Sequence, residues 1–244
     1  MNPGLSRLSG AVSLLVSVSD VEEAELALAA GVDLIDLKDP RAGALGALSV
    51  GELRDILAAI AGRCATSATT GDMAPDAEVV CAAAARIAAT GVDYVKVGLW
   101  PGPRRRDVIA QLGKGPGRQA HLVGVLLADG DPDFALVPAM AHAGFAGAML
   151  DVARKGSTLT QLMSADRLAS FVALCRTEGL ACGLAGSLRI ADISPLASLK
   201  PDILGFRGSL CHGRDRTRAL DPQSLDEAVA AMQTVRRERA ARAS

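Results

Sequence analysis

The stretch AVSLLVSVSDVEEAELALAAGVDLIDLK (residues 11–38) contains, in order, a strand, a helix and a second strand. Residues 11–18 and 32–38 are short runs of Val, Leu and Ile, which are typical of buried strands. Between them, Asp20 stands where a helix N-cap is expected, acidic residues fill the first turn, and Gly31 stands where the helix should end. The stretch therefore predicts a strand–helix–strand unit.

The same alternation of short apolar runs with Ala-rich helical segments continues along the whole chain. The predicted strands are 11–18, 32–38, 63–70, 92–99, 121–128, 147–153, 181–188 and 202–209. Each gap but the last contains a predicted helix, and a final helix is predicted over 224–241. Eight such units in 244 residues predict an α/β fold, the (β/α)8 or TIM barrel. We expect one domain over 1–244, with an N-terminal extension at 1–10 and a polar tail at 236–244.

A doubly wound open sheet is the main alternative for an alternating chain. That fold usually has fewer strands and a glycine-rich first turn between strand and helix. Here the first turn is VSVSDVEE (residues 16–23), which contains no G-x-G-x-x-G motif. The sequence therefore favours the barrel.

Composition and charge indicate the kind of partner. Half of the residues are apolar, 22% are charged, and the net charge is −1. Basic residues are scattered apart from PRRRDV (103–108) and RRERAARA (236–243), so we expect no nucleic-acid partner. The opening MNPGLSRLSG (1–10) has no apolar run typical of a secretory signal, and the longest uncharged stretch, 134–150, is too short for a membrane span. We expect a cytoplasmic protein that acts on a small molecule, without a membrane partner, and its apolar Ala-rich helices favour a homo-oligomer.

The five cysteines form no C-x-x-C pair and leave one over in any pairing. This pattern argues against both a disulfide framework and a zinc site. We therefore expect reduced thiols. No metal and no cofactor are expected either, since a lysine imine can itself act as the electron sink.

Charged residues recur on the inward face of the predicted strands. Asp36 and Lys38 share one face of the second strand, and Lys96 lies at the same phase in the fourth. Asp151 lies at this phase in the sixth strand, and Lys155 follows it if the extended chain continues. All five lie near the carboxyl ends of the strands, where TIM barrels carry their active sites. For a single lysine an ordinary ion pair is an equally good interpretation, but the joint phase of Lys38 and Lys96 favours a site.

A lysine in such a place has specific chemistry. Burial and a neighbouring ammonium lower the pKa of its side chain, so that part of the population is a neutral amine that attacks a carbonyl and forms an imine. The protonated imine then accepts electrons, and a carbon next to it loses a proton easily. A second base is needed nearby, and Lys96, Asp36 or Asp151 is suitably placed.

Two glycine–serine pairs follow the seventh and eighth strands, in AGSLR (185–189) and FRGSL (206–210). These are the loops in which barrels hold phosphate on backbone N–H groups. A single Gly-Ser pair is more often a plain turn, but two at matching strand ends favour a phosphate site. Its predicted residues are Gly186, Ser187, Gly208 and Ser209, with Arg207 or Arg189 as the cation. Asp72, at the end of the third strand, is a further candidate for the site.

Five motifs carry a resemblance to a known family. They are LLVSVSDVEEAELALAAGVDLIDLKDPRAGALGA (14–47), SATTGDM (67–73), DYVKVGL (93–99), GAMLDVARKGSTLTQLM (147–163) and GLAGSL (183–188). Together they resemble the (5-formylfuran-3-yl)methyl phosphate synthase family, whose members make the furan precursor of methanofuran, a carrier in one-carbon metabolism. The similarity extends from about residue 12 to about residue 235.

The resemblance implies a TIM-barrel lyase that condenses two molecules of glyceraldehyde 3-phosphate, with loss of phosphate and water, through a lysine Schiff base. It implies that Lys38 forms the Schiff base, that Lys96 accepts a proton, and that Asp151 and Lys155 belong to the active site. A Schiff-base aldolase acting on a sugar phosphate needs the same groups and is the alternative enzyme. A non-catalytic barrel that binds a phosphorylated metabolite is the alternative from another class.

Overall fold

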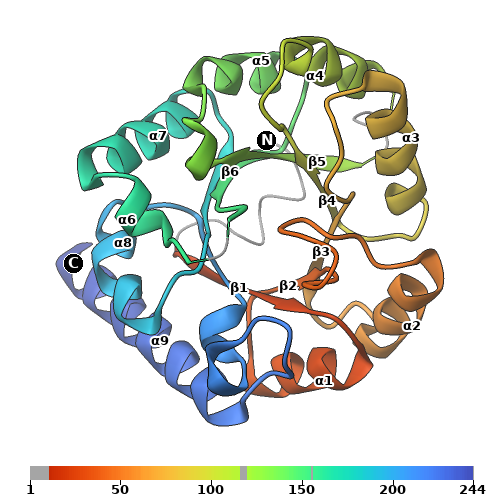
Figure 1. The fold of residues 1–244 in the computed structure, drawn as a ribbon. Helices are drawn as coiled ribbons and strands as arrows, with labels where there is room; N and C mark the ends of the chain where they lie inside the picture. The colour runs from red at the N-terminus through yellow and green to blue at the C-terminus, as the bar shows by residue number, and fades with distance from the viewer. Residues whose placement is uncertain (1–10, 116–119, 155, 244) are drawn as a thin grey trace.

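Eight parallel strands close into a barrel in the order of the sequence (Figure 1). The computed structural model describes residues 11–115, 120–154 and 156–243. Pairing of the first strand with the eighth completes the barrel, so the TIM-barrel prediction is confirmed. The strands are β1 (Ser13–Val18), β2 (Leu34–Leu37), β3 (Ala65–Thr69), β4 (Tyr94–Gly98), β5 (His121–Leu127), β6 (Gly147–Asp151), β7 (Ala181–Leu184) and β8 (Ile203–Phe206). Each lies within its predicted range.

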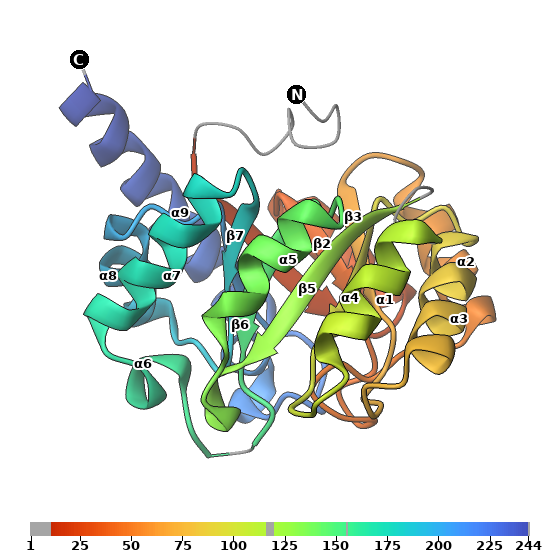
Figure 2. The same ribbon diagram turned by 90° about the horizontal axis from the view of Figure 1, so that it is seen from above.

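The helices form a ring around the barrel, and the end of the last one extends past this ring (Figures 1 and 2). They are α1 (Val21–Ala30), α2 (Val50–Ile60), α3 (Ala77–Ala88), α4 (Arg105–Lys114), α5 (Val137–His142), α6 (Leu159–Leu162), α7 (Ala165–Thr177), α8 (Ile193–Ser198) and α9 (Pro222–Ala243). None of the described helices combines the length and the apolar character that a membrane crossing requires.

The first strand–helix–strand unit has the predicted boundaries. The Asp20 carboxylate accepts a hydrogen bond from the backbone N–H of Glu23 at 2.9 Å, which caps α1. Gly31 ends the helix in the left-handed conformation, with φ of 76°. The two residues therefore act as the start and stop signals that the sequence suggests.

One prediction about the helices is wrong. The last gap, between β7 and β8, contains α8. Pro195 is the third residue of this helix, where a backbone N–H has no partner within the helix, so proline does not break it. With only six residues, α8 shows too little periodicity to be recognised in the sequence.

The strands separate two apolar cores. The larger core lies between the barrel and the helices and includes Val16, Ile35 and Val95. The smaller core fills the barrel interior with Leu15, Leu34, Tyr94, Val125, Met149 and Ile203, among others. This division confirms the predicted phase of the strands, in which alternate residues point inward. The polar inward residues form a layer above this apolar interior, on the carboxyl side of the strands, since Ser17, Asp36 and Ser67 are paired across β1, β2 and β3.

Candidate active site at the carboxyl ends of the strands

A fully buried ion pair lies at the centre of the barrel mouth. The Lys96 ammonium donates to the Asp36 carboxylate at 3.0 Å, and the two residues are 2% and 0% exposed. The hydroxyls of Ser17 and Ser67 donate to the same carboxylate at 3.0 and 2.6 Å. Burial alone would raise the pKa of Asp36, but the charges of Lys96 and Lys38 and these hydrogen bonds hold that pKa below its usual value. Asp36 is therefore a fixed negative charge inside the barrel.

Lys38 directly follows β2 and faces a cavity at this end of the barrel. Its amine donates to the carbonyl of Ala44 at 3.4 Å. Lys38 is half-buried, and the partial desolvation of its ammonium lowers its pKa below the usual value. The carboxylates of Asp151 and Asp36 oppose this lowering of the pKa, and the Lys96 ammonium adds to it. The predicted pair of lysines is therefore brought together.

The loop that carries the Ala44 carbonyl is held by Asp72, which follows β3. The Asp72 carboxylate accepts hydrogen bonds from the backbone N–H groups of Ala44 and Leu45 at 3.0 and 2.8 Å. A Cβ atom on Gly43 would lie 2.0 Å from this carboxylate, so only glycine fits there. Asp72 thus fixes the loop against which the Lys38 amine rests.

Asp151 closes the other side of the site from the end of β6. Its side chain is 6% exposed, and its carboxylate accepts the backbone N–H of Val152 at 2.7 Å. The next turn is held by Asp129, whose carboxylate accepts the N–H groups of Ala153 and Arg154 at 3.1 and 2.8 Å. Lys155, the remaining predicted residue of this loop, lies outside the described residues.

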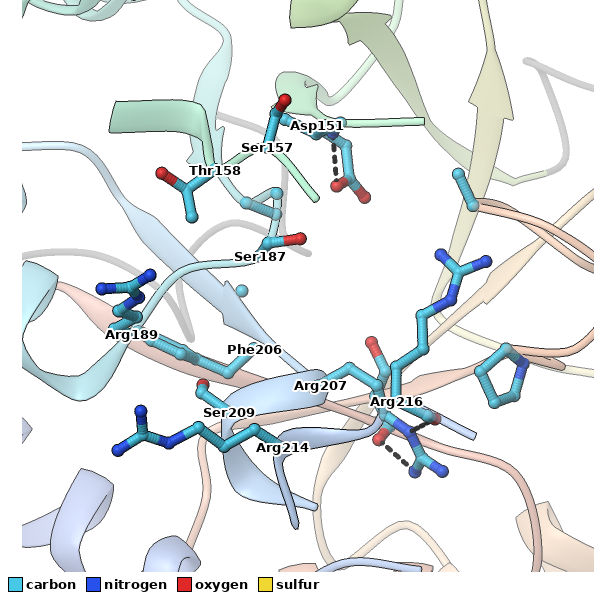
Figure 3. Close-up of a pocket in the computed structure, with 18 of the residues that line it drawn as sticks. Asp151, Ser157, Thr158, Ser187, Arg189, Phe206, Arg207, Ser209, Arg214 and Arg216 are labelled. Atoms are coloured by element: carbon cyan, nitrogen blue, oxygen red, sulfur yellow. Dashed lines mark hydrogen bonds between the residues drawn. The ribbon is translucent and has the colours of Figure 1, made fainter. Parts of the chain in front are cut away.

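The cavity has a volume of about 490 Å³, within the range typical of small-molecule sites. Lys38, Lys96 and Asp151 line it, together with the loops that follow β6, β7 and β8 (Figure 3). The loop residues include Arg154, Ser157, Thr158, Gly186, Ser187, Arg189, Arg207, Gly208, Ser209, Arg214 and Arg216. The two predicted groups of residues, the lysine cluster and the glycine–serine loops, therefore face one space.

The glycine–serine loops have the features of an anion site. Gly186 has φ of +111°, and a Cβ atom there would lie 2.5 Å from the Val152 side chain. Ser187 also has a positive φ, 51°, which is unusual for a residue with a side chain. Figure 3 shows the Ser187 hydroxyl directed into the cavity. The Ser209 hydroxyl is buried and has no hydrogen-bond partner among the described residues, and a phosphate oxygen would provide one.

The sequence model of the family described as 4-HFC-P synthase matches residues 14–229. The chain belongs to this family. A (5-formylfuran-3-yl)methyl phosphate synthase of Methanocaldococcus jannaschii is 38% identical over 216 residues, covering 83% of this chain and 92% of that protein. The synthase of Methanosarcina mazei is 33% identical, covering 91% of this chain and all of that protein. A protein of Methylorubrum extorquens, whose name assigns the same activity provisionally, is 50% identical, covering 90% of this chain and 91% of that protein.

Solved structures show the same fold at low sequence identity. KGPDC from Streptococcus mutans superimposes with a TM-score of 0.65 at 13% identity, covering 92% of this chain and 98% of that one. The 3-hexulose-6-phosphate synthase of Salmonella typhimurium gives 0.64 at 16% identity, covering 92% of this chain and all of that one. At these identities the similarities support the barrel fold and carry no information about the reaction.

In this member of the 4-HFC-P synthase family, Arg207 is arranged differently from the expected phosphate ligand. Its buried guanidinium donates to the carboxylate of Glu23 in α1 and, at 3.0 Å, to the Ser17 carbonyl. It also donates to the carbonyls of Arg216 and Arg218 at 3.0 and 3.1 Å. Because these contacts use most of its N–H groups, we assign Arg207 to holding the loop after β8 instead of contacting phosphate directly.

The sequence interpretation missed three residues of this 4-HFC-P synthase site. Ser17 and Ser67 lie at the inward phase of β1 and β3, so the strand pattern did contain a signal for them. Arg216 lies in an irregular loop, where no periodicity indicates which way a side chain points. Only the folded chain brings it to the cavity.

Gly186→Ala tests the glycine–serine loops of this member of the 4-HFC-P synthase family. We expect the Michaelis constant for the phosphorylated substrate to rise about 10-fold or more, because the new methyl group crowds Val152 and moves the loop, and a charge-assisted hydrogen bond is worth about 1.5–3 kcal/mol. Gly31→Ala is the matched control, since Gly31 also has a positive φ but has open space around it. Equal effects of the two changes on the Michaelis constant would contradict the assignment.

Proposed function

We propose that this chain condenses two molecules of glyceraldehyde 3-phosphate into (5-formylfuran-3-yl)methyl phosphate, with Lys38 as the residue that forms the imine. The observation that carries the proposal is a lysine of lowered pKa that faces a cavity, beside the buried Asp36–Lys96 pair. Membership of the 4-HFC-P synthase family supports the same reaction. The enzyme would be a carbon–oxygen lyase of methanofuran-type one-carbon cofactor synthesis.

The reaction begins with the neutral amine of Lys38. It attacks the carbonyl carbon of one triose phosphate, and the carbonyl oxygen leaves as water as the imine forms. Removal of a proton from the neighbouring carbon gives an enamine, since the electron pair of that C–H bond moves toward the imine nitrogen. The enamine carbon then attacks the carbonyl of the second triose.

Lys96 is assigned as the acceptor of that proton. It must first be neutral, and it releases its proton toward the cavity, which it lines, because the Asp36 carboxylate 3.0 Å away stays ionised. The hydroxyls of Ser17 and Ser67 keep Asp36 in place during this exchange. Asp151, on the opposite side of Lys38, is suited to proton transfer during the loss of water. A role for Lys155 stays a prediction from the family resemblance.

The number of phosphates in the reaction calls for a cavity with more than one anion-binding element. Two trioses bring two phosphates, and the furan product retains one of them after loss of one phosphoric acid and two water molecules. The loops around Gly186–Ser187 and Gly208–Ser209 are assigned to the retained phosphate, because both line the cavity and Gly186 and Ser187 have the positive φ values of a tight anion-binding turn. The electron pair released when the C–H bond breaks is accepted by the protonated imine.

Borohydride trapping tests the proposal directly. The protein is incubated with glyceraldehyde 3-phosphate, reduced with borohydride and digested, and the peptides are analysed by mass spectrometry. The expected result is a triose adduct on the peptide that contains Lys38, together with a product that absorbs in the near ultraviolet. An aldol product would not absorb there and would favour the aldolase alternative. An adduct confined to other lysines would overturn the assignment of Lys38.

The pH dependence of trapping gives a second prediction. Imine formation needs the neutral amine, which is present above the pKa of Lys38 and lost as the pH falls through it. Because burial lowers this pKa, we expect the midpoint of the trapping rate to lie below the ordinary lysine value of about 10.4. Trapping of Nα-acetyl-lysine amide under the same conditions provides the reference. Coincident midpoints for the protein and the reference would contradict the lowered pKa.

A further inference from the structure

Arg216 reaches the cavity from the loop after β8. It lines the same cavity as Lys38, and its side chain is partly buried. Figure 3 shows Arg189 and Arg214 on the side of Ser187 and Ser209, whereas the Arg216 guanidinium projects away from those serines, across the mouth of the cavity. Arg216 is therefore separate from the glycine–serine loops.

One polar atom of the Arg216 side chain is unpaired within the described part of the chain. Its Nε atom is buried and has no hydrogen-bond partner among the described residues, although buried polar groups are normally paired. The charged side chains that most affect the Lys38 amine are the carboxylates of Asp151 and Asp36 and the cations Lys96 and Arg216. Among the charged residues that line the cavity, cations outnumber carboxylates, and such an excess attracts an anion: they are Lys38, Lys96, Arg154, Arg189, Arg207, Arg214 and Arg216 against Asp151 and Asp215.

The backbone of Arg216 is held in place by Arg207. Its carbonyl accepts the Nε–H of Arg207 at 3.0 Å, and Arg207 is anchored to Glu23 and to the Ser17 carbonyl. A Cβ atom added to Gly208 would lie 3.5 Å from the Arg216 Cβ, so this loop packs directly on the Gly208 turn. These contacts hold the backbone from which the Arg216 side chain extends along the cavity.

We propose that Arg216 binds the second of two phosphates in this cavity, the one that belongs to the triose not held by the Gly186–Ser187 and Gly208–Ser209 loops. This inference rests on the proposed function in so far as two triose phosphates enter the site. A guanidinium presents paired N–H groups that match two phosphate oxygens, which a lysine ammonium does not. Arg216 thereby selects a second substrate that is phosphorylated.

Calorimetric titration with inorganic phosphate tests this position without any turnover. We expect the unmodified protein to bind two phosphates per chain. Arg216→Gln should retain one site and weaken the other about 10- to 100-fold, the effect of losing a hydrogen bond between charged groups. Arg218→Gln is the matched control, because Arg218 lies in the same loop, is exposed and contributes its backbone carbonyl to the Arg207 network. It should retain both sites.

Trapping with glyceraldehyde, which lacks a phosphate, separates binding from chemistry. Arg216→Gln should still form the adduct on Lys38 with glyceraldehyde, while the Michaelis constant for glyceraldehyde 3-phosphate rises about 10- to 100-fold. The pH midpoint of trapping should rise in this variant, because a positive charge near the Lys38 amine is removed. A variant with merely disturbed structure would lose the glyceraldehyde adduct as well.

The inference is overturned if the unmodified protein binds a single phosphate, or if Arg216→Gln retains both sites with unchanged affinity. If Arg216→Gln does not fold, as judged by circular dichroism, Arg216→Lys serves instead, since it keeps the charge and loses the paired geometry. It should weaken one phosphate site by a smaller factor, and two unchanged sites would again overturn the inference. Absence of a furan product with two phosphates bound would contradict the proposed function alone.

Discussion

Lys38→Met should abolish formation of the furan product, with kcat/KM lowered by about 10⁴-fold or more, because loss of the covalent nucleophile removes every later step. The adduct with glyceraldehyde 3-phosphate should disappear from the peptide that contains residue 38. Steady-state assays at raised enzyme concentration measure the first effect, and mass spectrometry after borohydride reduction measures the second. Lys114→Met is the matched control, since Lys114 is exposed at the end of α4.

The same substitution should leave the free energy of unfolding unchanged or raise it. The pKa of Lys38 is lower in the folded chain than in the unfolded one, so between these two values the unfolded chain binds more protons. Stability of the unmodified protein should therefore rise with pH through this interval, and Lys38→Met should lack that rise. Urea denaturation at several pH values measures the difference. A Lys38→Met protein that still forms the furan would remove the basis of the proposed reaction.

Lys96→Met should both inactivate and destabilise the protein. It leaves the Asp36 carboxylate buried without its ammonium partner, a change that typically lowers the free energy of unfolding by about 3–5 kcal/mol. Loss of a proton acceptor should lower kcat by about 10²- to 10⁴-fold. Denaturant titration and steady-state kinetics measure the two losses.

A second substitution separates the two effects of Lys96→Met. In the double variant Asp36→Asn, Lys96→Met the buried charge is removed together with its partner, so most of the lost stability should return. Ser17 and Ser67 donate to different oxygens of Asp36 in the unmodified protein. In the double variant the side-chain amide oxygen at position 36 can still accept from one of these hydroxyls, and the NH2 group can donate to the other. Activity should not return. If Lys96→Met alone were as stable as the unmodified protein, the ion pair would not hold the site together as described.

The sequence was sufficient for the barrel and for the lysine cluster because both depend on strand periodicity. Side chains alternate strictly between the two faces of a strand, so Asp36 and Lys96 could be assigned to one interior from their phase alone. The structure adds the contacts between individual side chains, which the phase of a strand does not specify. The 3.0 Å contact between Lys96 and Asp36 joins neighbours that are 60 residues apart in the chain.

The remaining features depend on contacts outside regular elements. Arg207 lies beside the Gly-Ser pair that follows β8, which suggested a phosphate ligand, but its partners are a carboxylate on α1 and carbonyls of an irregular loop. Neither partner can be identified from periodicity. Arg216 was missed for the same reason. The helix α8 was missed because a short helix with a proline shows almost no periodic pattern. Loops therefore limit the prediction of function from this sequence more than strands do.

The link between Arg207 and Glu23 has a consequence for synthesis of the protein on the ribosome. The two side chains are 184 residues apart, and together they hold the loop that presents Arg216. A nascent chain that has emerged only as far as β7 already contains Lys38, Lys96 and Asp151, but it has neither β8 nor this anchored loop. Lys38 is thus translated early, whereas the cavity that it faces is completed only when the last strand joins the first.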